Sequence, residues 1–177
     1  MIRRQATPGI WGPLGVLICC TLFVGGCASR QIARPANYEM GERVFVKPLI
    51  YNVIETKWKS QLGDIPKVRV PQNRFLLVRL SVTNSGRKEA SVPLLAIEDS
   101  SGNSYTELSD GENIDDWLGL LRTVAPADTD QGWIAFDVPL ASYRLRVTNA
   151  ADPGDEQFAF VNLPLRLDSD TVLPPGK

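Results

Sequence analysis

The stretch Arg74–Thr83 reads RFLLVRLSVT, and its aliphatic and polar residues alternate along the chain. In an extended strand successive side chains point to opposite faces, so every second residue shares a face. The aliphatic face holds Leu76, Val78, Leu80 and Val82. The other face holds Arg79, Ser81 and Thr83. Such alternation predicts an antiparallel strand with one buried and one wet side.

Further short runs of this kind lie on both sides of that stretch, separated by Gly, Pro, Asn, Asp and Ser. They are Arg43–Val46, Leu49–Thr56, Ser91–Glu98, Ser104–Thr106, Gly132–Val138, Tyr143–Thr148 and Gln157–Asn162. Short strands at this spacing are typical of a β-sandwich. The sequence therefore predicts an all-β fold, an antiparallel β-sandwich.

One segment departs from the strand pattern. Ser109 and Glu112 have the spacing of a helix capping box. Apolar residues then follow at intervals of three and four, as on one face of a helix. They are Ile114, Trp117, Leu118 and Leu121. The pattern predicts one short helix, Asp110–Arg122, in a strand connection, where Trp117 would plug one end of the sandwich.

The N-terminus has the layout of a secretory signal, with Arg3 and Arg4 before an apolar stretch that ends at Val24. The stretch of about 15 residues is short for a helix that spans the roughly 30 Å hydrocarbon core. Residues 24–27 read VGGC and resemble the lipobox of bacterial lipoproteins. The resemblance implies removal of residues 1–26 and acylation of Cys27. An ordinary secretory signal and an uncleaved N-terminal anchor remain alternatives.

These patterns divide the chain into four parts. Residues 1–26 are expected to be the lipoprotein signal peptide, and residues 27–40 a lipidated N-terminus and tether, since they show no hydrophobic period. Residues 41–167 are expected to form the β-sandwich domain. Residues 168–177 are polar and rich in proline, which predicts a disordered tail.

Composition excludes several classes of function. The 177 residues contain no histidine, the commonest general base and metal ligand. The 19 basic and 20 acidic residues balance, with no basic stripe for phosphates, so nucleic acid is not an expected partner. No nucleophile, phosphate-loop or paired-cysteine motif occurs. We therefore expect no enzyme, no cofactor, no catalytic residue and no metal site.

Two groups of residues could nevertheless contact a ligand. The densest acidic group is interpreted as helix capping and solvation, with calcium left open. It comprises Asp110, Glu112, Asp115 and Asp116. Among the tryptophans, Trp117 and Trp133 are expected to pack in the core. Trp58 lies between Lys57 and Lys59, which places an aromatic ring near solvent, and it is the candidate for an exposed contact.

Three segments carry a resemblance to a known family: Phe75–Asn84, Asp99–Tyr105 and Gly132–Pro139. Their order resembles a bacterial domain family of unknown function, found in secreted and lipid-anchored proteins and akin to the secreted mycobacterial immunoprotective antigens. The resemblance implies an immunoglobulin-like sandwich and supplies no catalytic residue. The sequence departs from the family at Ala125–Asp128, where Pro-Gly is more usual.

Together these features predict a membrane-anchored cell-envelope lipoprotein that acts as a non-catalytic protein-binding or assembly module. Its partners would be the membrane, through the lipid, and an envelope protein. Ala28 after Cys27 fits sorting to the outer membrane, facing the periplasm. The alternative function is a periplasmic carrier or sensor of a small apolar ligand, bound between the sheets under the expected helix.

Overall fold

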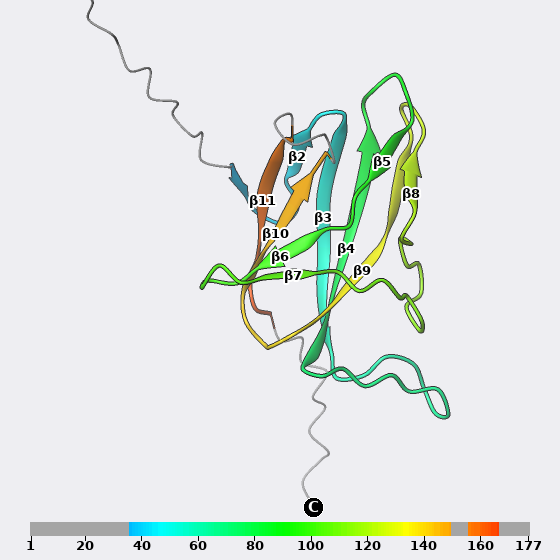
Figure 1. Cartoon of the computed structure of the whole chain (residues 1–177), viewed down its shortest axis with the longest axis vertical. Coiled ribbons are helices and arrows are strands. Elements are labelled where there is room, and N and C mark those ends of the chain that lie inside the picture. Colours follow the sequence, from blue (N-terminus) through cyan, green and yellow to red (C-terminus); the bar gives the residue numbers. More distant parts are fainter. Residues whose placement is uncertain (1–35, 150–155, 167–177) are drawn as a thin grey trace, which may run out of the picture. The chain divides into compact units, whose positions relative to one another are not determined.

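The structure is a computed structural model that describes residues 36–149 and 156–166 (Figure 1). All of these residues belong to one compact unit, Arg34–Lys177. The expected signal peptide, Cys27 and the expected tail at 168–177 lie outside the described residues. Within the described ranges no helix has the length and apolarity needed to cross a membrane.

Nine of the eleven described strands form two main sheets, and the described part of the chain contains no helix (Figure 1). One sheet has the order β1-β11-β10-β6-β7, the other has the order β2-β3-β4-β9, and β5 pairs with β8 in a short ladder. The strands are β1 Asn37–Tyr38, β2 Arg43–Val46, β3 Leu49–Lys59, β4 Arg74–Asn84, β5 Ala90–Val92, β6 Ala96–Glu98, β7 Ser104–Thr106, β8 Arg122–Val124, β9 Thr129–Val138, β10 Tyr143–Thr148 and β11 Phe158–Leu163. The predicted all-β sandwich is confirmed at this level.

The interior between the two main sheets is built on the predicted aliphatic face of β4. Its four aliphatic residues are at most 2% exposed: Leu76, Val78, Leu80 and Val82. They join one cluster with side chains from the facing sheet, including Ile97 of β6 and Leu145 of β10. Burial of each such side chain contributes about 1.5–3 kcal/mol, so this cluster is the main source of stability.

The other face of β4 carries a second, smaller apolar cluster that the sequence did not reveal. Phe75 and Leu77 lie at the beginning of β4 on its outer side and are 1% and 6% exposed. They pack with Trp133 and Ala135 of β9 and with Leu62 from the loop after β3. The outer face is therefore dry at this end of the strand, whereas Arg79, Ser81 and Thr83 beyond it are half-buried.

The helix expected at Asp110–Arg122 is wrong. Asn113 and Asp116 have φ angles of 63° and 52°, and Gly119 has a φ of 83°, all in the left-handed region. Three such residues within seven positions interrupt any right-handed helix. The segment instead forms turns and ends in β8.

A long-range backbone partner explains why the helix does not form. The amide of Leu118 donates to the carbonyl of Trp133 (3.0 Å), and the amide of Trp133 donates to the carbonyl of Asp116 (2.9 Å). Edge strand β9 thus satisfies backbone groups that a helix would satisfy locally. The apolar spacing within residues 110–122 carries no information about β9, so it could not predict that β9 would bond this backbone.

Among the boundaries that differ from the sequence prediction, two change the strand order or the limits of the sandwich. The run Ser91–Glu98 is two strands, because β5 pairs with β8 while β6 pairs with β10. At the other boundary, β1 lies within the expected tether and pairs in parallel with β11. The amide of Phe160 donates to the carbonyl of Ala36 (2.9 Å). The sandwich therefore begins before residue 41.

A buried ion pair accounts for the break between β5 and β6. Glu107 and Arg122 form a salt bridge, and both side chains are only 1% exposed. The guanidinium of Arg122 also donates to the carbonyl of Pro93 (3.0 Å), and Glu107 accepts from the amide of Leu95 (2.7 Å). Between β5 and β6 these two side chains therefore bond backbone groups that a neighbouring strand would bond in a continuous sheet. Burial raises the pKa of Glu107, while Arg122 acts in the opposite direction.

Candidate functional site

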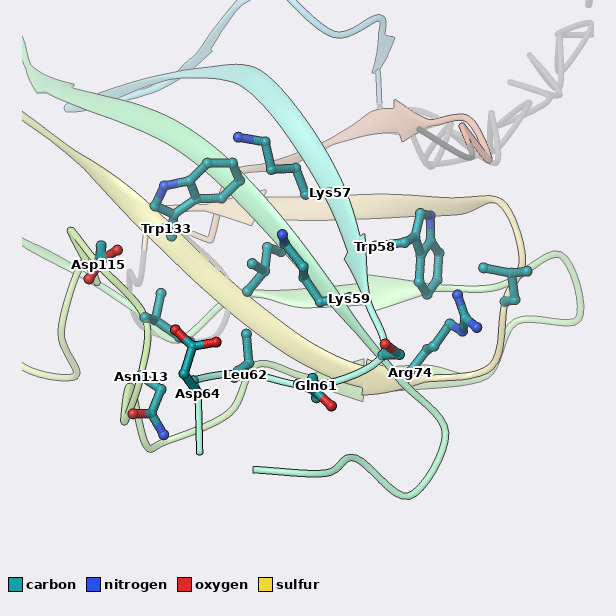
Figure 2. A pocket seen from close by; sticks show the side chains of 15 residues that line it. Lys57, Trp58, Lys59, Gln61, Leu62, Asp64, Arg74, Asn113, Asp115 and Trp133 are labelled. Carbon is teal, nitrogen blue, oxygen red and sulfur yellow. The ribbon is translucent and has the colours of Figure 1, made fainter. Parts of the chain in front are cut away.

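The candidate site is a groove of about 1320 Å³ that runs from the outer side of the four-stranded sheet around the end of β3 (Figure 2). It is bounded by two irregular segments, loop 60–73 and loop 107–121. Side chains from both loops pack on the outer apolar cluster, with Leu62 from the first and Leu108 and Ile114 from the second. The groove thus lies where two loops are seated on one sheet face.

Loop 60–73 has a defined conformation because its two arms pair. The amide of Leu62 donates to the carbonyl of Arg69 (2.9 Å), and the amide of Arg69 donates back to Leu62 (2.8 Å). Gly63, with a φ of 74°, turns the chain at this point, where a Cβ would lie 2.5 Å from the carbonyl oxygen of Lys67. Only glycine allows both this φ and this approach. The loop is therefore a small, fixed hairpin.

The two loops are joined to each other. The Arg69 guanidinium donates to the carbonyl oxygen of Asp110 (3.0 Å) and lies 3.3 Å from its carboxylate. The side-chain amide of Asn113 donates to the carbonyl of Lys67 (3.3 Å). These bonds join the two loops directly, so contacts within the protein shape the groove.

One glycine lets loop 107–121 approach the sheet, and another lets this loop fold against its own Trp117. A Cβ on Gly132 of β9 would lie 2.5 Å from the carbonyl oxygen of Asp116, and a Cβ on Gly111 would lie 2.0 Å from the ring of Trp117. Real Cβ atoms do not approach so closely, so both positions need glycine. The Trp117 indole N–H is buried and has no hydrogen-bond partner among the described residues.

Trp133 forms part of the groove wall beside β3. Its side chain is buried, as the sequence predicts, at 9% exposure. The Lys57 ammonium lies 4.9 Å from the ring centroid, and the Arg79 guanidinium lies 5.9 Å from it. Each cation–π contact is worth about 0.5–1 kcal/mol at an exposed site. The ring therefore holds these side chains on the outer face of the sheet.

Trp58 is half-buried and lines the groove at the opposite side from Asp115 (Figure 2). It also packs against the interior cluster, with its ring centroid 6.3 Å from that of Tyr143. Burial raises the pKa of Tyr143 to about 12, and its hydroxyl donates to the carbonyl of Pro139 (2.7 Å). Trp58 is thus less exposed than its charged neighbours indicate, and its role as a contact stays a prediction.

Charged side chains of opposite sign line the groove from different elements. Lys59 ends β3 and Arg74 begins β4, whereas Asp64 and Asp115 belong to the two loops. Figure 2 shows Asp64 and Asp115 on the opposite side from Arg74, with Lys59 between. None of these four forms an ion pair with another described residue, whereas Lys57 pairs with Glu55 (3.0 Å).

Sequence reasoning missed Lys59, Arg74 and Asp64 as site residues. The sequence singles out Lys59 only as a neighbour of Trp58, and Asp115 only as a member of the acidic group. The loops that bring these residues together are placed by contacts between positions far apart in the chain, which no local motif encodes.

The acidic group at 110–116 is divided by the structure. Asp110 accepts from the amide of Glu112 (2.8 Å) and pairs with Arg69, and Asp116 uses its carbonyl to hold Trp133. Asp115 lines the groove. The described ranges hold no group of three or more His, Cys, Asp or Glu side chains that could bind a metal ion. Turn formation replaces the expected helix capping.

Residues 38–159 match the family model described as a domain of unknown function (DUF4352). The chain belongs to this family. Both loops of the groove fall within the matched range, so the groove is part of the DUF4352 domain. No match is found among the curated proteins.

Three solved structures are similar to the DUF4352 domain described here. The yjhA protein of Bacillus subtilis is 14% identical, with a TM-score of 0.56 over 71% of this chain and 98% of its own. The secreted protein MPT63 of Mycobacterium tuberculosis is 16% identical, with a TM-score of 0.52 over 75% and 98%. The proposed lipoprotein ycdA of Bacillus subtilis is 13% identical, with a TM-score of 0.50 over 68% and 38%. These similarities show the shared fold.

The resemblance inferred from the sequence is therefore confirmed at the level of the family and the fold. A domain of unknown function matches, and a secreted mycobacterial protein has a similar structure.

Proposed function

We propose that this DUF4352 protein is a membrane-anchored cell-envelope lipoprotein that acts as a non-catalytic protein-binding module. The groove at the end of β3 would be its binding surface. The observation that carries the proposal is a groove held open by contacts between its own loops, with unpaired charges along it. Preformed sites of this kind bind without paying for loop ordering.

The surroundings of the groove support a protein partner. Ile65, next to Asp64, is 90% exposed, and Val70 in the same loop is 74% exposed. Leu140 lines the groove and is 43% exposed. Large apolar side chains beside polar ones are typical of protein interfaces, where a dry centre is surrounded by a polar rim.

The lipid anchor is proposed from the lipobox-like residues 24–27, with Cys27 as the modified residue. Location at the outer membrane, facing the periplasm, is proposed with it. A secreted protein and a proposed lipoprotein among the structures of similar fold support an envelope or extracellular location. The immunoglobulin-like arrangement of the sandwich remains part of this proposal.

The alternative, a carrier of a small apolar ligand, is less well supported. It requires a pocket between the sheets, and that space is occupied by fully buried side chains such as Tyr51, Phe136 and Leu145. The groove itself is lined largely by charged and amide side chains. Apolar ligands favour apolar walls with few polar groups.

Photocrosslinking in living cells tests the proposed function. A photoreactive amino acid at Gln61, which is exposed and lines the groove, should capture one discrete envelope protein. The matched control is Thr123 on β8, which is exposed and does not line the groove. Capture should fall when Cys27→Ala removes the lipid, because the anchor raises the local concentration. Equal capture from both positions, or none from Gln61, would reject the proposal.

A further inference from the structure

We propose that the groove binds an extended polypeptide segment that carries both acidic and basic side chains, with its carboxylates toward Lys59 and Arg74 and its cations toward Asp64 and Asp115. This inference rests on the proposed function and names the chemistry of the partner. It follows from how the four charges are placed, how they are kept apart and how large the groove is.

The first step is that the positive and negative side chains of the groove come from different kinds of element, strands and loops. The two cations come from the paired ends of β3 and β4, where Lys59 lies beside Phe75 in register. The two anions come from the loops, on the far side of Lys59 from Arg74 (Figure 2). All four side chains belong to exposed residues. The groove therefore has a basic side made by the strand ends, with Lys59 on the outer face of the sheet and Arg74 on the face of Trp58, and an acidic side made by the loops.

The second step is that the backbone holds the acidic side in place. Asp64 is fixed in a turn, since the amide of Lys67 donates to its carbonyl (2.8 Å). Asp115 follows Asn113, whose side chain is bonded to the carbonyl of Lys67. Because the loops are pinned to each other and to the outer apolar cluster, they do not carry the carboxylates across to the sheet.

The third step excludes ligands of one sign. A uniformly anionic ligand, such as a membrane surface rich in phosphate, would gain from Lys59 and Arg74 but be repelled by Asp64 and Asp115. A uniformly cationic ligand meets the reverse conflict. Opposed charges of this kind act as a selection against single-sign ligands. A segment with both signs gains on both sides.

The fourth step is size and apolar content. A volume of about 1320 Å³ exceeds the roughly 300–1,000 Å³ of most small-molecule pockets and fits several residues of an extended chain. Trp58 and Leu140 line the groove together with Arg74. An apolar residue next to the acidic residues of the partner would therefore pack against Trp58 and Leu140 beside Arg74.

The test uses the full lipidated chain in detergent and synthetic 12-residue peptides. The probe has an Asp-rich half and a Lys-rich half separated by Leu, with no net charge. Controls are an all-acidic peptide, an all-basic peptide and vesicles of phosphatidylglycerol. At low salt the mixed peptide should bind at least tenfold more tightly than either single-sign peptide. Tighter binding of the acidic peptide or of the vesicles would overturn the inference and identify an anion site.

Charge reversal gives the decisive comparison. The double variant Lys59→Glu/Arg74→Glu should lose at least tenfold in affinity for the mixed peptide. Adding Asp64→Lys/Asp115→Lys should restore affinity to within about threefold, because the reversed groove accepts the same peptide in the opposite direction. Failure of this rescue in a variant with unchanged thermal unfolding would refute the inference.

The outcome is separable from that of the proposed function. Capture of a partner at Gln61 together with failed rescue would leave the binding module intact and reject the mixed-charge partner. If no partner were captured at Gln61, the proposed protein-binding function would be rejected.

Discussion

Opposite charges are treated in two contrasting ways within this domain. At Glu107, just after β7, and Arg122, the first residue of β8, they form a pair that is almost fully buried and holds the backbone near Pro93 and Leu95. In the groove, two cations and two carboxylates remain exposed and apart. A buried pair costs several kcal/mol in desolvation per ion, so it must be complete to be tolerated. Exposed charges carry little of that cost and stay available for a partner.

The largest expected effect comes from breaking the buried pair. Arg122→Ala should lower the free energy of unfolding by about 3–5 kcal/mol, because it leaves the Glu107 carboxylate buried without its cation. Urea unfolding followed by tryptophan fluorescence measures the change. The double variant Glu107→Gln/Arg122→Met should recover a substantial part of the loss. A loss below about 1 kcal/mol in the single variant would show that the pair is not buried as described.

A smaller effect is expected where loop 107–121 meets β9. Gly132→Ala should destabilise the domain by about 1–3 kcal/mol, since its Cβ would lie 2.5 Å from the carbonyl oxygen of Asp116. Gly41→Ala is the matched control, because nothing lies within 4 Å and only its φ of 90° opposes alanine. Thermal unfolding of both variants, with photocapture from Gln61, would show whether the loop contact also shapes the groove. If a folded but destabilised Gly132→Ala protein still captured the partner as well as the wild type, the loop contact would support stability alone and not the shape of the groove.

Acid should weaken the protein through Glu156, in contrast to Glu107. The Thr148 hydroxyl, and then Arg146, hold the pKa of Glu156 below its ordinary value of 4.5. The resulting stabilisation is present above that value and is lost as the pH falls through the lowered folded pKa. Thr148→Val removes the largest cause, so its urea midpoint should fall less on acidification from about pH 6 to about pH 3 than that of the wild type. Parallel pH profiles would contradict this assignment.

The smallest effect sharpens the contrast between the two charge groups. Lys59→Glu/Arg74→Glu should change the free energy of unfolding by no more than about 0.5 kcal/mol, because both residues are exposed and form no ion pair with a described residue. The same urea titration measures it. A loss comparable to that of Arg122→Ala would mean that these cations support the fold rather than a partner.

Most of the strands, though not β1 or β8, were predictable because their signal is local. In β4 the aliphatic side chains repeat at every second position, and the structure buries all four of them. The helix prediction was wrong for the opposite reason. The apolar spacing across residues 114–121 fits a helix, yet Leu118 is 9% exposed while Leu121 is 100% exposed. The backbone partner that overrode the spacing, β9, lies further along the chain.

The groove was not predictable because its parts come from distant positions. Arg69 and Asp110 join the two loops across 41 residues, and the capping-box spacing around Asp110 indicated a helix rather than this contact. The sequence drew attention to Trp58 through its charged neighbours, and the structure places that residue at the edge of the groove. Its neighbour Lys59, rather than the ring, carries the charge pattern.

The pairing of β1 has a mechanical consequence. The strand is two residues long, lies at the edge of its sheet, and is attached through Asn37 and Tyr38 to β11. Tension on the chain before Ala36 acts on this attachment first. The bond from the side-chain amide of Asn162 to Glu39 (2.6 Å) and the backbone bond from the amide of Gly41 to the carbonyl of Val53 lie beyond it. Release of residues 36–40 would add about 17 Å of extended chain to the N-terminal segment, while every other strand stayed paired. If the chain is anchored through Cys27 as proposed, release of β1 under load would lengthen the link between the bilayer and the groove.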